Sequence, residues 1–289
     1  GLVWAAGGLQ SDCLRETNYF CIQIRTDETN PQRRHLLLDR LTHSIVDLDD
    51  PTKLLYRYEQ VYAEVVNALT PPGKTPSALF IGGGGYVFPR YLEAAYPGSR
   101  LDVVEIDPAV TAVNYQYLGL SPQTTIVSIN EDARRYLNHL PPGTHYDLIL
   151  GDAFNDVSVP YHLTTREFNE QIAAHLSDDG LFLANIIDGR ALNFFRAYVY
   201  TLQQTFPYVY AAPTVGTPGE IRRQTFVIVA ARQDLAAAMS ANPLVETFLT
   251  QAELDAILKQ APSILLTDDF VPVDNLLEPL LRETGTQTP

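Results

Sequence analysis

The chain has 289 residues, which is enough for one large domain, or for one large and one small domain. Hydrophobic residues make up 46% of it, which argues against wholesale disorder. Its 34 acidic and 20 basic residues give a formal net charge of −14. A negative field of that size repels nucleic-acid phosphates and anionic membrane surfaces. It favours either a cationic substrate or solubility alone.

The spacing of cysteine and histidine predicts no metal site. Cys13 and Cys21 form no Cys-x-x-Cys pair, and the six histidines follow no metal-binding spacing. We expect two free thiols in a reducing compartment. A disulfide between them stays open, because spacing alone carries no geometry.

Residues 1–52 are predicted to form a small N-terminal β domain. The apolar segments 19–24 and 35–38 flank the polar stretch 27–34, which contains Asn30-Pro31, and this pattern is typical of a hairpin. A third strand is expected at residues 44–46.

Residues 53–289 are predicted to form one α/β domain. Apolar residues recur at helical spacing over 53–69, and Pro71-Pro72-Gly73 ends that helix. Strands then alternate with helices, which predicts a mainly parallel sheet. The expected strands are 78–81, 101–106, 125–129, 146–150 and 180–185, with an edge hairpin from 208–210 and 224–229; the expected helices are 89–95, 109–117, 133–140, 165–176 and 275–281.

Each of the first four strands of this domain runs into glycine or acid. The first is followed by the glycine run 82–85, which fits neither the P-loop pattern nor Gly-x-Gly-x-x-Gly. Ligands bind beyond the carboxyl ends of such strands. Because no basic cluster is present there to hold phosphates, these strand ends favour a nucleoside without a phosphate chain.

Two acids are placed to bind such a nucleoside. Glu105 follows Gly82 by about 20 residues, the interval of a ribose-binding acid, and Asp132 is placed for the adenine amino group. An acidic rim also suits the positive charge of a sulfonium. The alternatives are a tight glycine turn, a solvated strand end at Glu105, and an Asp132 that caps the following helix.

The fourth strand ends at a candidate catalytic acid. Asp152 follows a strongly apolar strand, so we expect a partly buried carboxylate that acts as a general base or holds an amine. Asp147 and Asp156 are acidic neighbours that would raise its pKa if they lie close. Asp156 is equally well explained as loop surface.

These residues resemble the spermidine synthase family of aminopropyltransferases over about residues 16–232. The resemblance implies a Rossmann-like S-adenosylmethionine-dependent methyltransferase fold with a small N-terminal β domain, a homodimer, and decarboxylated S-adenosylmethionine as donor. It implies that Asp152 deprotonates an amine nucleophile. The family's donor-binding residues correspond to Gly82, Gly84, Gly85, Glu105, Asp132 and Ala133.

The chain departs from the family at the amine end of the site. Gly85 replaces an Asp that holds the amine of the aminopropyl group, which weakens the case for a decarboxylated donor and allows S-adenosylmethionine itself. The family's second acid corresponds here to Asn155, or, with a shift of one residue, to Asp156. His43 stands where the family has a glutamine, and Tyr56 matches the family's tyrosine. We expect these four residues to bind substrate.

Three functions follow from this pattern. The first is transfer of an aminopropyl group to a di- or polyamine. The second is methyl or aminocarboxypropyl transfer from S-adenosylmethionine to another small amine. The third is a non-catalytic sensor of nucleoside or polyamine. None involves a metal or nucleic acid.

The two ends of the chain suggest a larger protein. The first residues lack an initiating Met and a basic leader, which fits either a piece of a longer chain or ordinary processing. Residues 266–274 resemble the tail of spermidine synthase-like domains fused behind membrane segments. The expected location is the cytoplasm, or the cytoplasmic side of a membrane. Asp268 and Asp269 are further candidates for the acidic site.

Overall fold

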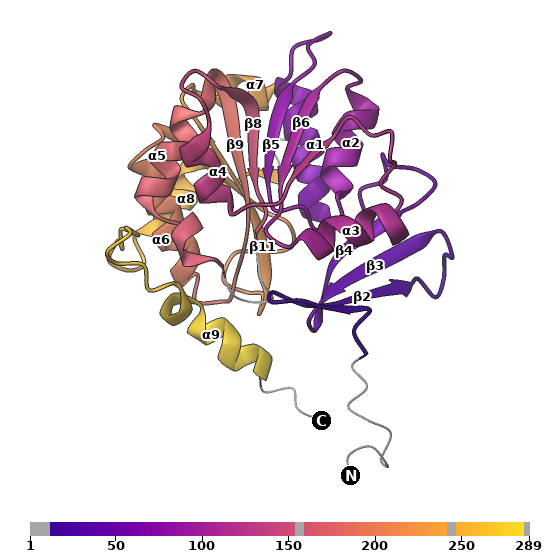
Figure 1. Cartoon of the computed structure of the whole chain (residues 1–289). Helices are drawn as coiled ribbons and strands as arrows, with labels where there is room; N and C mark the ends of the chain where they lie inside the picture. The colour runs from indigo at the N-terminus through magenta and orange to yellow at the C-terminus, as the bar shows by residue number, and fades with distance from the viewer. Residues whose placement is uncertain (1–11, 154–158, 242–246, 286–289) are drawn as a thin grey trace.

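The computed structural model describes residues 12–153, 159–241 and 247–285, which form two β-sheets and the helices that cover them (Figure 1). The small sheet is four-stranded and antiparallel, and the large sheet has seven strands. This arrangement is the predicted Rossmann-like α/β fold preceded by a small β unit.

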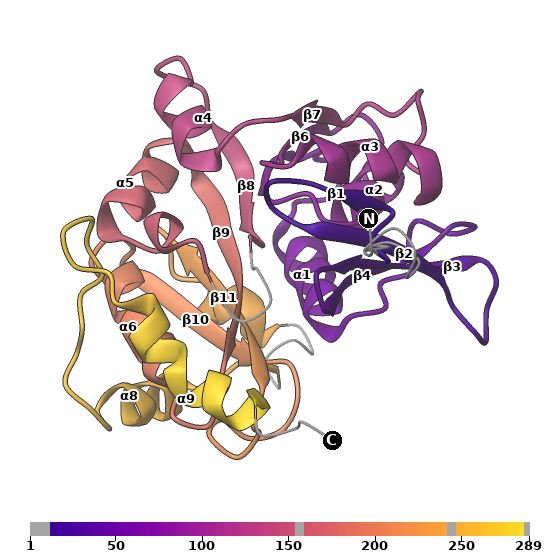
Figure 2. The ribbon, with the colours of Figure 1, turned by 60° about the horizontal axis from the view of Figure 1, so that its bottom comes forward.

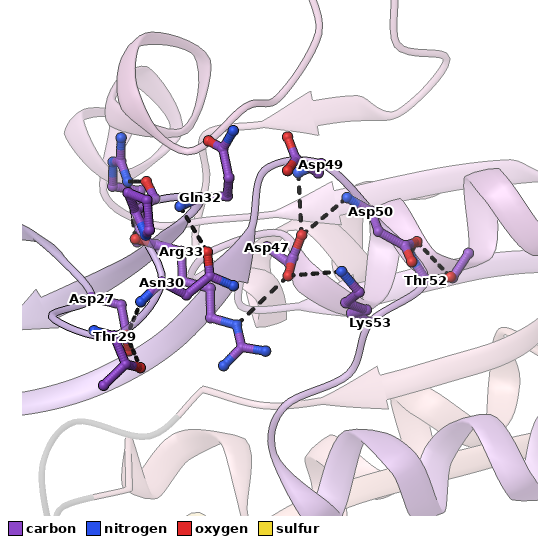
Figure 3. Close-up of polar contacts among 12 residues, drawn as sticks. Asp27, Thr29, Asn30, Gln32, Arg33, Asp47, Asp49, Asp50, Thr52 and Lys53 are labelled. Carbon is purple, nitrogen blue, oxygen red and sulfur yellow. Dashed lines mark hydrogen bonds and ion pairs between the residues drawn. The ribbon is translucent and has the colours of Figure 1, made fainter.

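The small sheet confirms the predicted hairpin and third strand. Its order is β1 (Arg15–Glu16), β2 (Cys21–Thr26), β3 (Arg33–Leu38) and β4 (Leu41–Asp47). The buried Asp47 carboxylate at the end of β4 lies 3.6 Å from Arg33 Nε and 3.3 Å from Lys53 Nζ, as Figure 3 shows. One carboxylate therefore ties β3, β4 and the segment before the first helix together.

The two cysteines are joined in a disulfide, so the expectation of free thiols is wrong. The β1–β2 hairpin turns the chain back between them and brings their Cα atoms to 5.2 Å, which is within bonding range. The loop that this bond closes also contains Thr17, whose hydroxyl donates to Asp107 Oδ2 at 2.7 Å. The bond therefore fixes a segment that contacts the large domain.

The large sheet has the strand order β10-β11-β9-β8-β5-β6-β7. Five strands are parallel, and β11 and β10 add an antiparallel hairpin at one edge, as predicted. From β5 the chain adds β6 and β7 on one side of β5, and it then adds β8 on the other side. The carboxyl end of β5 is therefore the topological switch point of the sheet. The strands are β5 (Ser77–Ile81), β6 (Arg100–Val104), β7 (Val127–Ile129), β8 (Tyr146–Gly151), β9 (Leu176–Asp188), β10 (Tyr208–Pro213) and β11 (Gln224–Ala231).

Helices cover both faces of this sheet (Figure 2). A hydrophobic core lies on each face of the sheet, and successive side chains of a strand pack into alternate cores. In β5, Leu79 and Ile81 pack on one face, and Ala78 and Phe80 pack on the other. The first face carries α4 (Ala133–His139), α5 (Arg166–Ala174), α6 (Asn193–Gln203), α8 (Gln251–Leu258) and α9 (Val273–Gly285); the second carries α1 (Arg57–Leu69), α2 (Val87–Ala95) and α7 (Ala236–Ser240).

The small sheet packs against the large domain through a third core cluster. Phe20 and Ile22 of the β1–β2 hairpin meet Val87 of α2 and Val110 of α3 (Pro108–Tyr117). This contact places β4 beside the switch point. The domain boundary at residue 52 stays a prediction. No helix in the described part of the chain is both long enough and apolar enough to cross a bilayer.

We expect reduction of the Cys13–Cys21 bond to destabilise the N-terminal unit. Closing so short a loop stabilises a fold by about 2.5 kcal/mol in the chain-entropy account, because the cross-link restricts the unfolded chain. Melting followed with and without dithiothreitol should show a lower Tm after reduction, and a Cys13→Ser/Cys21→Ser variant should not respond to the reductant. An equal response of the variant would show that the bond has no such effect.

Candidate active site

A two-lobed cleft opens at the switch point of the sheet. One lobe, of about 240 Å³, is lined by Glu105, Asp132 and Ala133 and is called the Glu105 lobe below. The other, of about 340 Å³, is lined by Glu59 of α1, His43 of β4 and β9 residues and is called the Glu59 lobe. The residues that line both lobes are His43, Gly82, Gly84 and Asp152.

Gly82 allows the two central strands to end in close contact. It follows β5 with a φ of +97°, and its amide donates to the Val104 carbonyl at 2.9 Å. A Cβ atom there would overlap the carbonyl oxygen of Asp152. Glycine is therefore required by both backbone conformation and space. The close contact brings the ends of β5 and β8 together where the two lobes meet.

Glu105 is a buried acid held by backbone amides. Its Oε2 accepts from the Gly83 amide at 2.8 Å, and its Oε1 accepts from the Asp107 amide at 2.9 Å. Burial raises the pKa of Glu105, and these hydrogen bonds oppose the rise. The alternative of a solvated strand end is wrong, because only 6% of the residue is exposed.

Asp132 both caps a helix and lines the Glu105 lobe. Its Oδ1 accepts from the Arg135 amide at 2.9 Å at the start of α4, so the capping interpretation is confirmed. Its Oδ2 lies 2.8 Å from Nε2 of His162, which the short helix η1 (Tyr161–Leu163) places at the same lobe. Glu105, Asp132, Ala133 and Gly82 thus share one cavity, as the sequence predicted.

Gly85 lines neither lobe and is covered by β4. Its amide donates to Ser44 Oγ at 2.9 Å. A Cβ atom at this position would lie 2.6 Å from Ser44 Cβ and 3.0 Å from Val46 Cγ2. Because the φ of Gly85 is not positive, the constraint on this residue is steric. An acidic side chain fits here only if β4 moves.

Asp152 stands at the junction of the two lobes, and two side chains fix its carboxylate. Tyr58 Oη donates to Oδ2 and Asn185 Nδ2 donates to Oδ1, each at 2.9 Å. Burial raises the pKa of Asp152, and both hydrogen bonds lower it. Asp147 does not meet the condition for raising this pKa, because it lies at the other end of β8 and binds Lys74.

The Glu59 lobe contains functional candidates that the sequence analysis missed, among them Tyr58, Glu59 and Asn185. Burial is the main cause that raises the pKa of Glu59 to about 8, and the charge of Asp152 adds to it. The sequence carried signals for these residues. Tyr58 and Glu59 lie two and three residues after Tyr56, in the first turn of α1, and Asn185 lies near the end of the fifth strand of the large domain.

The predicted substrate-binding residues fall into two groups. His43 lines both lobes, and Tyr56 lines the Glu59 lobe, where its ring stacks on Tyr58 at 5.9 Å between centroids. Asn155 and Asp156 lie outside the described residues. Asp268 does not line either lobe; it pairs with Arg134, and its Oδ1 accepts from Thr165 Oγ1 at 2.8 Å.

We expect the protonation of Glu59 to make stability depend on pH. The folded protein holds a proton at Glu59 up to about pH 8, whereas the unfolded chain releases it near 4.5. The free energy of unfolding therefore falls as pH rises through this window, by up to about 1.4 kcal/mol per pH unit.

Urea unfolding between pH 5 and 8.5 measures this slope. Glu59→Gln should reduce it, because the amide cannot ionise. Glu64→Gln, on the same helix, is the matched control and should keep the wild-type slope, because Glu64 is a half-exposed partner of Arg57. An unchanged slope in Glu59→Gln would contradict a protonated Glu59.

We also expect Gly85→Ala to destabilise the fold by about 1–3 kcal/mol, the usual cost of overpacking. The added methyl group would press on Ser44, so Ser44→Gly should relieve part of this cost in the double variant. A double-mutant cycle of unfolding free energies measures the coupling, which should be about 1 kcal/mol for residues in contact. Strict additivity would show that β4 does not close this position.

Comparisons with known proteins agree with the fold. No sequence model of a protein family matches the chain. A polyamine aminopropyltransferase of Vibrio vulnificus is 36% identical over 140 residues, which cover 48% of the chain and 46% of that protein. An eEF1A lysine and N-terminal methyltransferase of Mus musculus is 29% identical over 159 residues, which cover 51% of the chain and 22% of that protein.

The fold comparison covers more of the chain. A probable spermidine synthase from Corynebacterium glutamicum superposes with a TM-score of 0.77 at 19% identity, over 87% of the chain and 95% of that structure. The chain spans less than half the length of the two curated relatives above. By its fold, with the small antiparallel sheet in front of the large one, and by its sequence relatives over about half of its length, the chain is similar to spermidine synthases and polyamine aminopropyltransferases.

Proposed function

We propose that the protein transfers an aminopropyl group from decarboxylated S-adenosylmethionine to a di- or polyamine, with Asp152 as general base. The observation that carries the proposal is the position of Asp152. Its carboxylate stands where the two lobes meet, and Tyr58 and Asn185 fix its orientation. One lobe then holds the donor and the other holds the acceptor.

The Glu105 lobe suits the nucleoside of the donor. Glu105 would accept from the ribose hydroxyls, and Asp132, beside Ala133, would accept from the adenine amino group. The backbone of Gly82 and Gly84 would approach the sugar and the sulfur closely, because these residues carry no side chain. A donor without phosphates needs none of the basic residues that a nucleotide would require.

Asp152 supplies the proton transfer that the reaction needs. A primary amine in the Glu59 lobe gives its proton to the carboxylate, and its lone pair attacks the carbon bonded to the sulfonium. The C–N bond forms as the C–S bond breaks, and the bonding electrons go to sulfur, so neutral methylthioadenosine leaves. Burial raises the pKa of Asp152, which helps it to hold the proton.

The remaining assignments on the acceptor side are part of this proposal. His43 and Tyr56 would line the path of the amine, and Asn155 and Asp156 keep their predicted role although they lie outside the described residues. A homodimer and a full-length protein attached to a membrane also stay predictions.

A second candidate is transfer from intact S-adenosylmethionine, of a methyl or an aminocarboxypropyl group. The observation that favours it is Gly85, because β4 closes the position where the family carries an acid for the donor amine. An acid there would repel the donor carboxylate. Calorimetry with the two donors side by side distinguishes the candidates: tighter binding of S-adenosylmethionine favours the second.

We expect Asp152→Asn to lower kcat by about 10²- to 10⁴-fold, because the amide cannot accept the proton. Donor binding should change less than kcat, since Glu105 and Asp132 also line the nucleoside lobe. Asp147→Asn, the same change at the opposite end of β8, is the matched control and should keep kcat. Release of methylthioadenosine from decarboxylated donor and putrescine measures the rate. Full turnover in Asp152→Asn would remove Asp152 from the mechanism.

A further inference from the structure

His162 lies at the nucleoside end of the cleft, where no step of the proposed reaction uses it. It belongs to the short helix η1 and lines the Glu105 lobe together with Asp132. Nε2 of its ring lies 2.8 Å from Asp132 Oδ2. An ionised carboxylate has no proton to give, so this nitrogen is the donor. His162 therefore holds the same acid that the proposed function assigns to the adenine amino group.

Two donors from different elements fix the Asp132 carboxylate. The Arg135 amide of α4 donates to Oδ1 at 2.9 Å, and the His162 ring donates to Oδ2. Each carboxylate oxygen can accept two hydrogen bonds, so each keeps one for a ligand. With the amide as its sole donor, the carboxylate could rotate about its bond to Cβ and turn Oδ2 away. The ring of His162 removes that freedom.

Arg134 and Asp268 hold η1 in place. Arg134 Nη1 donates to the His162 carbonyl at 3.2 Å and to Asp268 Oδ1 at 2.7 Å, and Nη2 donates to Asp268 Oδ2. Such a bidentate pair fixes the plane of the guanidinium. Asp268 Oδ1 also accepts from Thr165 Oγ1 at the start of α5. Asp268, which the sequence analysis proposed for the acidic site, thus reaches the cleft through Arg134 and His162.

We propose that His162, supported by Arg134 and Asp268, is a positioning residue that sets the base specificity of the Glu105 lobe by fixing Asp132 as the acceptor for an exocyclic amino group. The proposal rests on the proposed function, because it takes this lobe as the site of the nucleoside.

A fixed acceptor distinguishes two purine bases. Adenine presents an amino group at C6, which donates to a carboxylate. Hypoxanthine presents an oxygen there, and two facing acceptors leave each other unsatisfied. A site built for a hydrogen bond rejects the base that cannot make it. A carboxylate that is free to turn away loses part of this discrimination, because it neither binds the first base as well nor opposes the second as strongly.

Methylthioadenosine and methylthioinosine, which differ in the base at C6, test the proposal. Calorimetry gives the Kd of each nucleoside with the wild type, His162→Gln and His162→Phe. Glutamine keeps a donor at about the reach of Nε2, whereas phenylalanine keeps a ring and loses the donor. His145→Phe is the matched control, because His145 is exposed, directly precedes β8 and lines neither lobe.

We expect the wild type to bind methylthioadenosine about tenfold tighter than methylthioinosine, or more. His162→Phe should lower that ratio by about fivefold, whereas His162→Gln and His145→Phe should keep it. General damage to the lobe would weaken both nucleosides by the same factor and would not move the ratio. Equal binding of the two nucleosides by the wild type overturns the proposal. So does a ratio that His162→Phe leaves unchanged, or that His162→Gln lowers as far.

Asp268→Asn tests the support of η1. Loss of the ion pair with Arg134 should lower the same ratio, but by less than His162→Phe does. Because the route passes through the His162 ring, Asp268→Asn should add nothing in the His162→Phe background. Additive losses in the double variant would overturn the part of the proposal that concerns Asp268.

Turnover separates this inference from the proposed function. Product release by the wild type, with a nucleoside ratio that His162→Phe does not change, leaves the transferase standing and overturns the role of His162. Absence of product with every donor and acceptor, with a ratio that falls in His162→Phe, removes the proposed function and leaves the role of His162 standing. The binding comparison decides in both cases, because it needs no catalysis.

Discussion

The close contact between the ends of β5 and β8 determines how this site is built. Gly82 has no side chain, so its backbone lies against the carbonyl of Asp152. This contact sets the strand ends that line the Glu105 lobe beside Asp152. A residue with a side chain at position 82 would separate the two strand ends, and the lobes would no longer share Asp152. The rest of the site depends on that junction.

Three acids are buried around the junction, and each is stabilised in a different way. Glu105 accepts from the backbone amides of Gly83 and Asp107. Asp152 accepts from the side chains of Tyr58 and Asn185, so its orientation depends on α1 and β9. Glu59 remains largely protonated. Burial raises the pKa of all three, and hydrogen-bond donors around each carboxylate oppose that rise.

The sequence predicted the features of the fold and the site that depend on local residue patterns. Strand–helix alternation indicated the parallel sheet, and the residues at the strand ends indicated Gly82, Glu105, Asp132 and Asp152. It did not predict the disulfide, because bonding depends on how the hairpin folds back. It also left open whether Asp147 lies close to Asp152, and the two residues stand at opposite ends of β8. Tyr58 and Asn185 were missed because their role appears only when α1 and β9 meet β8.

The small N-terminal sheet contributes residues to the two-lobed cleft. Ser44 of β4 fills the space beside Gly85, and His43 lines both lobes. The methyl and methylene groups of β4 thereby close the space beside the glycine run, and the same strand supplies part of the cleft wall. A shift of β4 would therefore change the packing of Gly85 and the shape of the cleft at the same time.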